Sequence, residues 1–262
     1  TSAYTIGKAE ARQYLLGEAE LDQVMPFVSS WQDNAGRYRW NTTLFVSIRQ
    51  VKAQGEALAQ MYRRALVLEG LSRRAGYFCN NYCWRDNKNT YAGNRDLTRK
   101  EIDEILGIFT EEGLPVSAQL DILSCIHDGY WQEKTKTNFI NECVMVMRLK
   151  KKKWGEDIVR LSREGNAIVR FLCIRMMEVY WQEYKEALLG CATDSSKQVR
   201  ELLVAVYEGI RDWEPEITGM LSSRRSQERE MAVQVLKRWG VQEHEEALRE
   251  AYEKEKSKKI KD

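Results

Sequence analysis

The sequence lacks the features that usually identify an enzyme or a membrane protein. Its 262 residues include only three prolines and two histidines, so a Ser–His–Asp or Cys–His catalytic group has few ways to form. It has no phosphate-binding glycine loop, no nucleophile elbow and no HExxH zinc motif. No apolar run approaches the roughly 18 residues of a membrane helix. We therefore expect no membrane span, no cofactor and no catalytic centre.

Cysteine is also sparse. Three of the six cysteines, Cys143, Cys173 and Cys191, lie in apolar stretches, where a free thiol behaves as a small apolar side chain. Cys79 and Cys83 form a CxxxC pair, but no second Cys or His pair stands at the spacing of a zinc site. The chain starts with neither Met nor a secretory leader. We expect reduced thiols, no metal, a cytoplasmic location and a longer parent protein.

Charge is nearly balanced over the whole chain. There are 41 basic and 39 acidic residues, and 43% of residues are apolar, which excludes a disordered chain. A net charge of +2 does not by itself indicate a nucleic-acid partner. The distribution is uneven, however, because residues 37–100 hold 13 basic and 4 acidic side chains.

This basic region supplies a candidate binding surface. Two arginine pairs lie ten residues apart in one predicted helix, which separates them by about 15 Å along its axis. Arginines arranged along a surface can contact phosphates, and an aromatic side chain can stack on a base. The other interpretation is an ordinary helix face whose arginines pair with acids of other helices. The candidate surface comprises Arg37, Arg39, Arg63, Arg64, Arg73, Arg74, Trp84 and Arg85.

Almost every stretch between turn signals has helical spacing. Ile102, Ile105, Leu106 and Phe109 recur at i, i+3, i+4 and i+7. No stretch combines strand-like alternation with hairpin dipeptides, so the sequence predicts an all-α protein. The predicted helices cover residues 7–17, 20–30, 41–53, 56–76, 97–112, 116–128, 134–151, 155–163, 166–180, 182–192, 196–210, 215–222, 226–239 and 242–257.

Local signals place some helix ends and one boundary. Lys150–Lys153 follows a long apolar helix, and cations are favourable at a helix C-terminus. The connection 79–96 is long, polar and rich in Asn, which is typical of a functional loop or a boundary. We expect N-terminal helical repeats or a capping subdomain over residues 1–80, a loop over 81–96, and a repeat array over 97–262 with its last unit cut short. Candidate N-caps are Asp96 or Thr98, Ser117, Asn166 and Ser196.

Internal repetition is the strongest signal in the sequence. The arginines of two Val-Arg pairs, Arg170 and Arg200, lie 30 residues apart, and Arg229 follows after 29 more. The turn residue six positions before each arginine is Glu164, Asp194 or Ser223. Such a turn acid can pair with an arginine of its own or a neighbouring unit, and we take Arg200 as the partner of Asp194. A tryptophan is expected to open each repeat and to pack at the junction with the next one. These tryptophans are Trp154, Trp181, Trp213 and Trp239.

The turn acid, the Val-Arg pair and the apolar helix that follows, as in Asp194, Val199-Arg200 and Leu202–Val206, resemble the HEAT-repeat family of α-solenoids. The resemblance covers residues 154–257, is partial over 97–128 and is weak before residue 80. It implies an all-α, right-handed α-α superhelix of antiparallel helix pairs, armadillo-like in architecture. Similar arrays occur within large bacterial proteins, including regulators of molybdate metabolism.

Three functions are compatible with this sequence. Solenoids offer extended concave surfaces without a catalytic pocket, so the first is a non-catalytic scaffold that binds a protein or peptide. The second is nucleic-acid binding, because HEAT-like DNA-repair glycosylases are also all-helical, although none of their functional residues can be placed on this chain. The third is a spacer or regulatory arm. A continuous stripe of Arg and Lys would favour nucleic acid, whereas mixed charge would favour protein; the sequence does not specify the oligomeric state.

Overall fold

The computed structural model describes residues 8–32, 55–71, 97–129 and 132–255, together with Ser257 and Ile260. Every regular element in these ranges is a helix, which confirms the all-α class. The chain divides into two compact units, Thr1–Asp157 and Ile158–Asp262. The boundary predicted from sequence, residues 81–96, and the predicted helix 41–53 lie outside the described residues.

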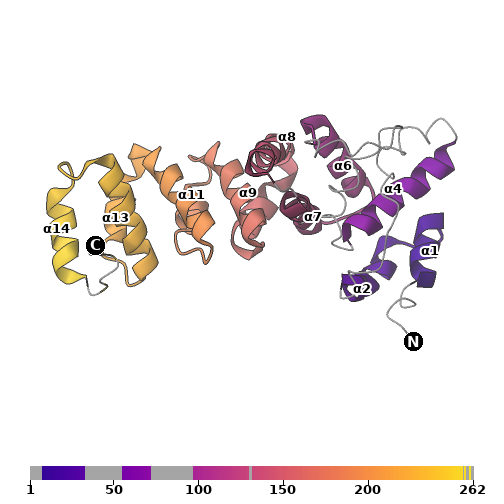
Figure 1. The fold of residues 1–262 in the computed structure, drawn as a ribbon, viewed down its shortest axis with the longest axis horizontal. Coiled ribbons are helices and arrows are strands. Elements are labelled where there is room, and N and C mark those ends of the chain that lie inside the picture. Colours follow the sequence, from indigo (N-terminus) through magenta and orange to yellow (C-terminus); the bar gives the residue numbers. More distant parts are fainter. Residues whose placement is uncertain are drawn as a thin grey trace. The chain divides into compact units, whose positions relative to one another are not determined.

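Unit 1 is a set of helices around a shared apolar core. α1 packs against α2 and α4, and α4 also contacts α6 and α7 (Figure 1). Leu66, Phe109 and Leu123 are fully buried between these helices. The helices are α1 (Lys8–Leu16), α2 (Leu21–Gln32), α4 (Glu56–Leu71), α6 (Arg99–Glu111), α7 (Val116–Gly129) and most of α8 (Glu133–Glu164).

Helix α8 is continuous, so the predicted break between residues 151 and 155 is wrong. Trp154 lies inside the helix and is only 4% exposed. Lys150 Nζ is 2.8 Å from Asp103 and 5.9 Å from the centre of the Trp154 ring. A single glycine such as Gly155 costs a helix only about 1 kcal/mol, less than the roughly 1.5–3 kcal/mol from burying a large apolar side chain. The lysine run therefore does not mark a helix C-terminus.

In unit 2, each of the pairs α10–α11 and α12–α13 has a short first helix and a longer second helix. Helix α9 takes the place of a second helix after the long α8, and α14 comes last. The second helices α9, α11 and α13 lie side by side in chain order, with α11 in contact with both of the others (Figure 1). α10 packs on α9, and α12 packs on α13. The elements are α9 (Ala167–Glu178), α10 (Lys185–Leu189), α11 (Lys197–Glu208), η2 (Arg211–Trp213), α12 (Glu214–Met220), α13 (Ser226–Gly240) and α14 (Glu245–Lys254).

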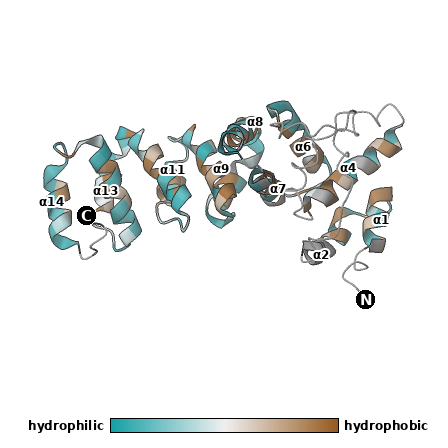
Figure 2. Ribbon diagram, viewed as in Figure 1, coloured by the Kyte–Doolittle hydropathy of each residue, from teal (hydrophilic) through white to brown (hydrophobic). Residues whose placement is uncertain are grey.

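The second helices bury their side chains in one common register. Cys173 on α9, Leu203 on α11 and Ala232 on α13 are all fully buried at equivalent positions. Three and four residues later, each helix buries two further apolar side chains, and Figure 2 shows the resulting two-sided colouring of α9 and α11. The spacings of 30 and 29 residues are thus a structural repeat. These later pairs are Met176 and Met177, Val206 and Tyr207, and Val235 and Leu236.

A buried side chain with an aromatic ring recurs just before each first helix, but it is not always one of the predicted tryptophans. The residue before the first helix of each pair is Tyr184, Trp213 or His244, and all three are buried. Trp239 belongs to the end of α13, and half-buried Trp181 precedes Tyr184 in the turn, with its ring 5.7 Å from that of Trp213. The tryptophans do pack in the core or at its edge, but only Trp213 opens a first helix.

Candidate functional site

The two described arginines of the predicted basic surface face carboxylates. Arg63 forms an ion pair with Glu111, and Arg64 Nε lies 3.8 Å from Glu112 Oε2. Both acids lie at the end of α6, so this part of α4 is an ordinary helix face with acid partners. The other candidates, Arg37, Arg39, Arg73, Arg74, Trp84 and Arg85, lie outside the described residues.

Glu112 is the centre of a polar cluster that links three helices of unit 1. Its carboxylate accepts hydrogen bonds from Tyr14 Oη at 3.2 Å and from Gln60 Nε2 at 2.5 Å. Burial, reinforced by the Glu112 charge, raises the pKa of Tyr14 well above its usual value, so the phenol remains a donor at neutral pH. With Arg64 6.0 Å from the Tyr14 ring centre, the cluster fastens α1 and α4 to α6. The polar side chains of Tyr14, Gln60 and Arg64 thus meet at one carboxylate within the packed helices.

Asp194 and Arg170 form the best-defined ion pair in unit 2. Arg170 donates from Nε and Nη2 to the two carboxylate oxygens at 2.6 and 2.8 Å. The side chains are 13% exposed for Arg170 and 5% exposed for Asp194. The hydrogen bond to Asp194 raises the pKa of Arg170 above its usual value, and the carboxylate also accepts the Ser196 N–H at 2.7 Å. This pair joins α9 to the turn before α11.

The predicted pairing of Asp194 with Arg200 is therefore wrong. Arg200 Nη1 donates to the main-chain oxygens of Asp194 at 2.6 Å and Ser195 at 3.0 Å. Arg200 lies on α11, directly after the turn that contains Asp194. Its side chain bonds to carbonyl groups of that turn, which accept no hydrogen bond within a helix. The carboxylate is left for the arginine of the preceding repeat.

The same arrangement recurs at the end of unit 2. Arg229 donates to Glu255 at 2.7 and 3.1 Å and to the main-chain oxygen of Ser223 at 2.9 Å. The Glu255 carboxylate accepts the Ser257 N–H at 2.8 Å, just as Asp194 accepts that of Ser196. Sequence reasoning missed Glu255, although residues 255–262 (EKSKKIKD) parallel residues 194–201 (DSSKQVRE). Glu164, the predicted turn acid of the first repeat, instead pairs with Arg160 on α8.

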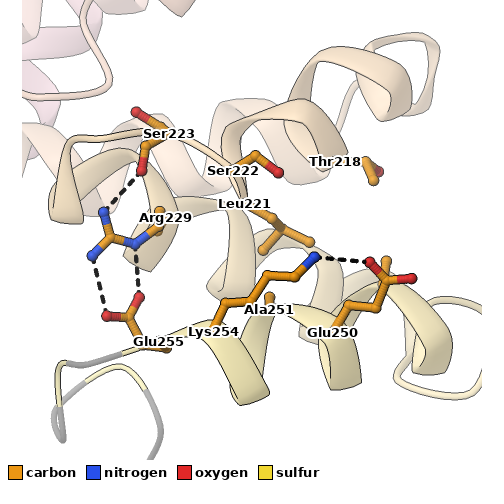
Figure 3. Close-up of a pocket in the computed structure, with 10 residues that line it drawn as sticks. Thr218, Leu221, Ser222, Ser223, Arg229, Glu250, Ala251, Lys254 and Glu255 are labelled. Atoms are coloured by element: carbon orange, nitrogen blue, oxygen red, sulfur yellow. Dashed lines mark hydrogen bonds and ion pairs between the residues drawn. The ribbon is translucent and has the colours of Figure 1, made fainter.

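We term the two ion pairs, Arg170 with Asp194 and Arg229 with Glu255, the clamps. A hollow of about 460 Å³ lies beside the second clamp (Figure 3). Figure 3 shows Arg229 directed toward Glu255 and Ser223, and Lys254 directed toward Glu250. Because a carboxylate pairs with each of these two cations, none of the described residues that line the hollow offers an unpaired positive charge to a phosphate group. It is a gap between helices rather than a built ligand site.

The outward side chains of α9, α11 and α13 form what we term the second-helix surface. Its charges are of both signs, and most of them pair with one another. Arg175 lies 2.6 Å from Glu178, and Arg238 on α13 lies 2.7 Å from Glu208 on α11. No continuous cationic stripe crosses this described surface. Its exposed or half-exposed polar residues include Arg175, Glu178, Lys197, Gln198, Glu201, Glu208, Ser226, Gln227, Glu230, Gln234, Lys237 and Arg238.

Both described histidines and the thiols of Cys143, Cys173 and Cys191 are buried. Burial raises the pKa of the Cys173 and Cys191 thiols, which keeps them protonated. His244 is 7% exposed, with Nδ1 3.6 Å from Glu214, whereas the sequence indicated a solvated face. His127 is also buried and contacts its neighbour Asp128 at 3.0 Å. Within the described ranges, no three His, Cys, Asp or Glu side chains are grouped to hold a metal ion.

Comparison of the chain with protein-family models, with curated proteins and with solved structures gave no match. Among the described helices, none has the length and apolar character needed to cross a membrane. The site must therefore be interpreted from its own geometry.

Proposed function

We propose that this chain is a non-catalytic scaffold of the α-solenoid type, HEAT-like in its repeats, whose second-helix surface binds a protein or peptide partner. Two repeated contacts support the solenoid architecture, because Arg170 and Arg229 each link one helix pair to a carboxylate of the next. Stacked pairs of this kind leave one long face of second helices open to a partner.

The observation that carries the functional part of the proposal is the mixed charge of the second-helix surface. A nucleic-acid site needs cations that replace the counterions of phosphates. Here Arg175 and Arg238 are engaged by carboxylates, and Gln198 and Gln234 present neutral amides in the same exposed layer. Exposed amides and paired charges suit a polar protein surface.

Site-specific photo-crosslinking tests the proposal. A crosslinking residue replaces Gln198 on α11 or Gln234 on α13, and the matched controls carry it at exposed Glu186 on α10 or Glu246 on α14. The chain is expressed in its native host and adducts are mapped by mass spectrometry. We expect one protein partner at the two second-helix positions and none at the two first-helix positions. Adducts that are confined to the control positions, or that contain nucleic acid, would overturn the proposal.

A further inference from the structure

The end of unit 2 carries an apolar groove, which we term the terminal groove. It has a volume of about 170 Å³ and lies between α13 and α14. Two large apolar side chains on its border remain exposed, Val241 at 52% and Tyr252 at 56%. Helix α14 has no buried residue between Glu245 and Lys254. The lining residues are Leu221, Arg229, Val233, Lys237, Val241, Leu248, Ala251, Tyr252, Glu255 and Ile260.

Ile260 already lies in this groove, in the register of a second helix. Asp194 precedes Val199, the first buried residue of α11, by five positions, and Glu255 precedes Ile260 by the same five. Ile260 is helical, and its N–H donates to the Ser257 oxygen at 3.1 Å. Because Asp194 and Glu255 make the same clamp, the groove continues the interface by which α11 packs beside α9 and α13 packs beside α11.

The sequence around the two clamps agrees with this register. Ser257 and Lys258 are identical to their counterparts at 196 and 197, and Ile260 replaces Val199. An acid precedes the turn in both segments, at Asp194 and Glu255. The segment therefore has the chemistry of a helix start that buries an aliphatic residue.

Charge on α13 indicates what the occupant carries farther along. Lys237 stands 29 residues after Glu208, in the same register. Glu208 on α11 accepts a hydrogen bond from Arg238 of the next helix at 2.7 Å. Lys237 carries the opposite charge to Glu208. A helix that occupies the groove in the same register therefore needs an acidic residue at the position equivalent to Arg238.

We propose that the terminal groove binds a further second helix of this same polypeptide, in which Ile260 takes the position that Val199 has on α11. Its following apolar residues fall four, seven and eight positions after Ile260, as they do after Val199 on α11. An acidic residue ten positions after Ile260 faces Lys237. This surface is separate from the second-helix surface, and the proposal does not depend on the partner of that surface.

The test extends the full chain after Asp262 with the α11 segment Leu202–Glu208 followed by glutamate, which continues the register of Ile260. The matched control inserts one alanine before the same extension and so rotates its apolar face by about 100°. We expect the in-register extension to raise Tm by about 3–6 °C and to slow amide exchange in α14 by about tenfold or more. The control should leave both unchanged.

Two further variants assign the effect to the groove. In the extended chain, Tyr252→Glu should abolish the gain in Tm. Lys237→Glu should reduce the gain, and replacing the terminal glutamate by lysine in that variant should restore it. An equal gain from the alanine-shifted extension would overturn the proposal. So would a dimer of the unextended chain that Tyr252→Glu dissociates, since a second copy would then be the occupant.

Discussion

The Asp194 carboxylate accepts two hydrogen bonds from Arg170, 24 residues earlier on the neighbouring helix, at 2.6 and 2.8 Å. Bidentate pairs of this kind combine a fixed geometry with charge-assisted strength. Since the two residues belong to successive helix pairs, the contact links the repeats rather than stabilising one of them.

Loss of Arg170 should therefore cost more stability than loss of Arg200. Arg170→Ala leaves the nearly buried Asp194 carboxylate without its counter-ion, and we expect the free energy of unfolding to fall by about 2–3 kcal/mol. Arg200→Ala removes bonds to main-chain oxygens only and should cost about 1 kcal/mol. Urea denaturation of both variants measures the difference. Equal losses, or a double variant with Asp194→Ala whose cost is the simple sum, would show that the clamp is not an energetic unit.

Tyr207 should contribute stability that disappears in alkali. Its hydroxyl donates to the Leu188 oxygen at 2.7 Å, so Tyr207→Phe should cost about 1 kcal/mol at neutral pH. Burial raises the pKa of Tyr207 well above its usual 10.0, so the folded state keeps the proton while the unfolded chain loses it above that pH. The stabilisation is complete below pH 10 and decreases as pH rises further.

Denaturation of wild type and Tyr207→Phe at about pH 8 and pH 11 isolates this contribution, because every other tyrosine titrates in both chains. We expect the difference in stability between the two to shrink at the higher pH. A difference that stays constant would mean that Tyr207 ionises equally easily in the folded and unfolded states.

His244 should behave as a packing ring rather than as a surface residue. It occupies the position of Tyr184 and Trp213, and its Nε2 is buried without a hydrogen-bond partner. We expect His244→Ala to lower the free energy of unfolding by about 2–3 kcal/mol, whereas His244→Phe should preserve it because the ring volume is retained. Thermal denaturation at neutral pH distinguishes the two variants. A silent His244→Ala would restore the solvated interpretation.

Signals that act within one helical turn were predictable from sequence. Thr98 caps α6 in a reciprocal arrangement with Glu101, and Asn166 caps α9 by accepting the N–H groups of Ile168 and Val169. Both depend on residues two or three positions away. Ser196 also stands at an N-cap, but without a side-chain bond; there the Asp194 carboxylate accepts its N–H.

Features that depend on distant residues were not predictable in the same way. The break expected before Gly155 ignored the contact of Lys150 with Asp103 on another helix. Repetition made Asp194 a clamp residue but could not choose between Arg170 and Arg200, because that choice depends on which side chain reaches across to the next pair. The position before each first helix was not predictable from a tryptophan pattern, because it holds Tyr184, Trp213 or His244.

Arg63 and Arg64 should affect stability rather than nucleic-acid binding. Their guanidinium groups face Glu111 and Glu112 on α6, and that position suits packing between helices better than contact with phosphates. We expect no binding of labelled single- or double-stranded DNA or RNA at about 50 mM salt. The combined Arg63→Ala and Arg64→Ala change should lower Tm by about 2–4 °C, and Lys152→Ala together with Lys153→Ala, on the exposed side of α8, is the control that should not. Micromolar binding that weakens steeply toward about 200 mM salt, and that disappears in the arginine variant but not in the lysine control, would instead establish a nucleic-acid site and replace the scaffold proposal.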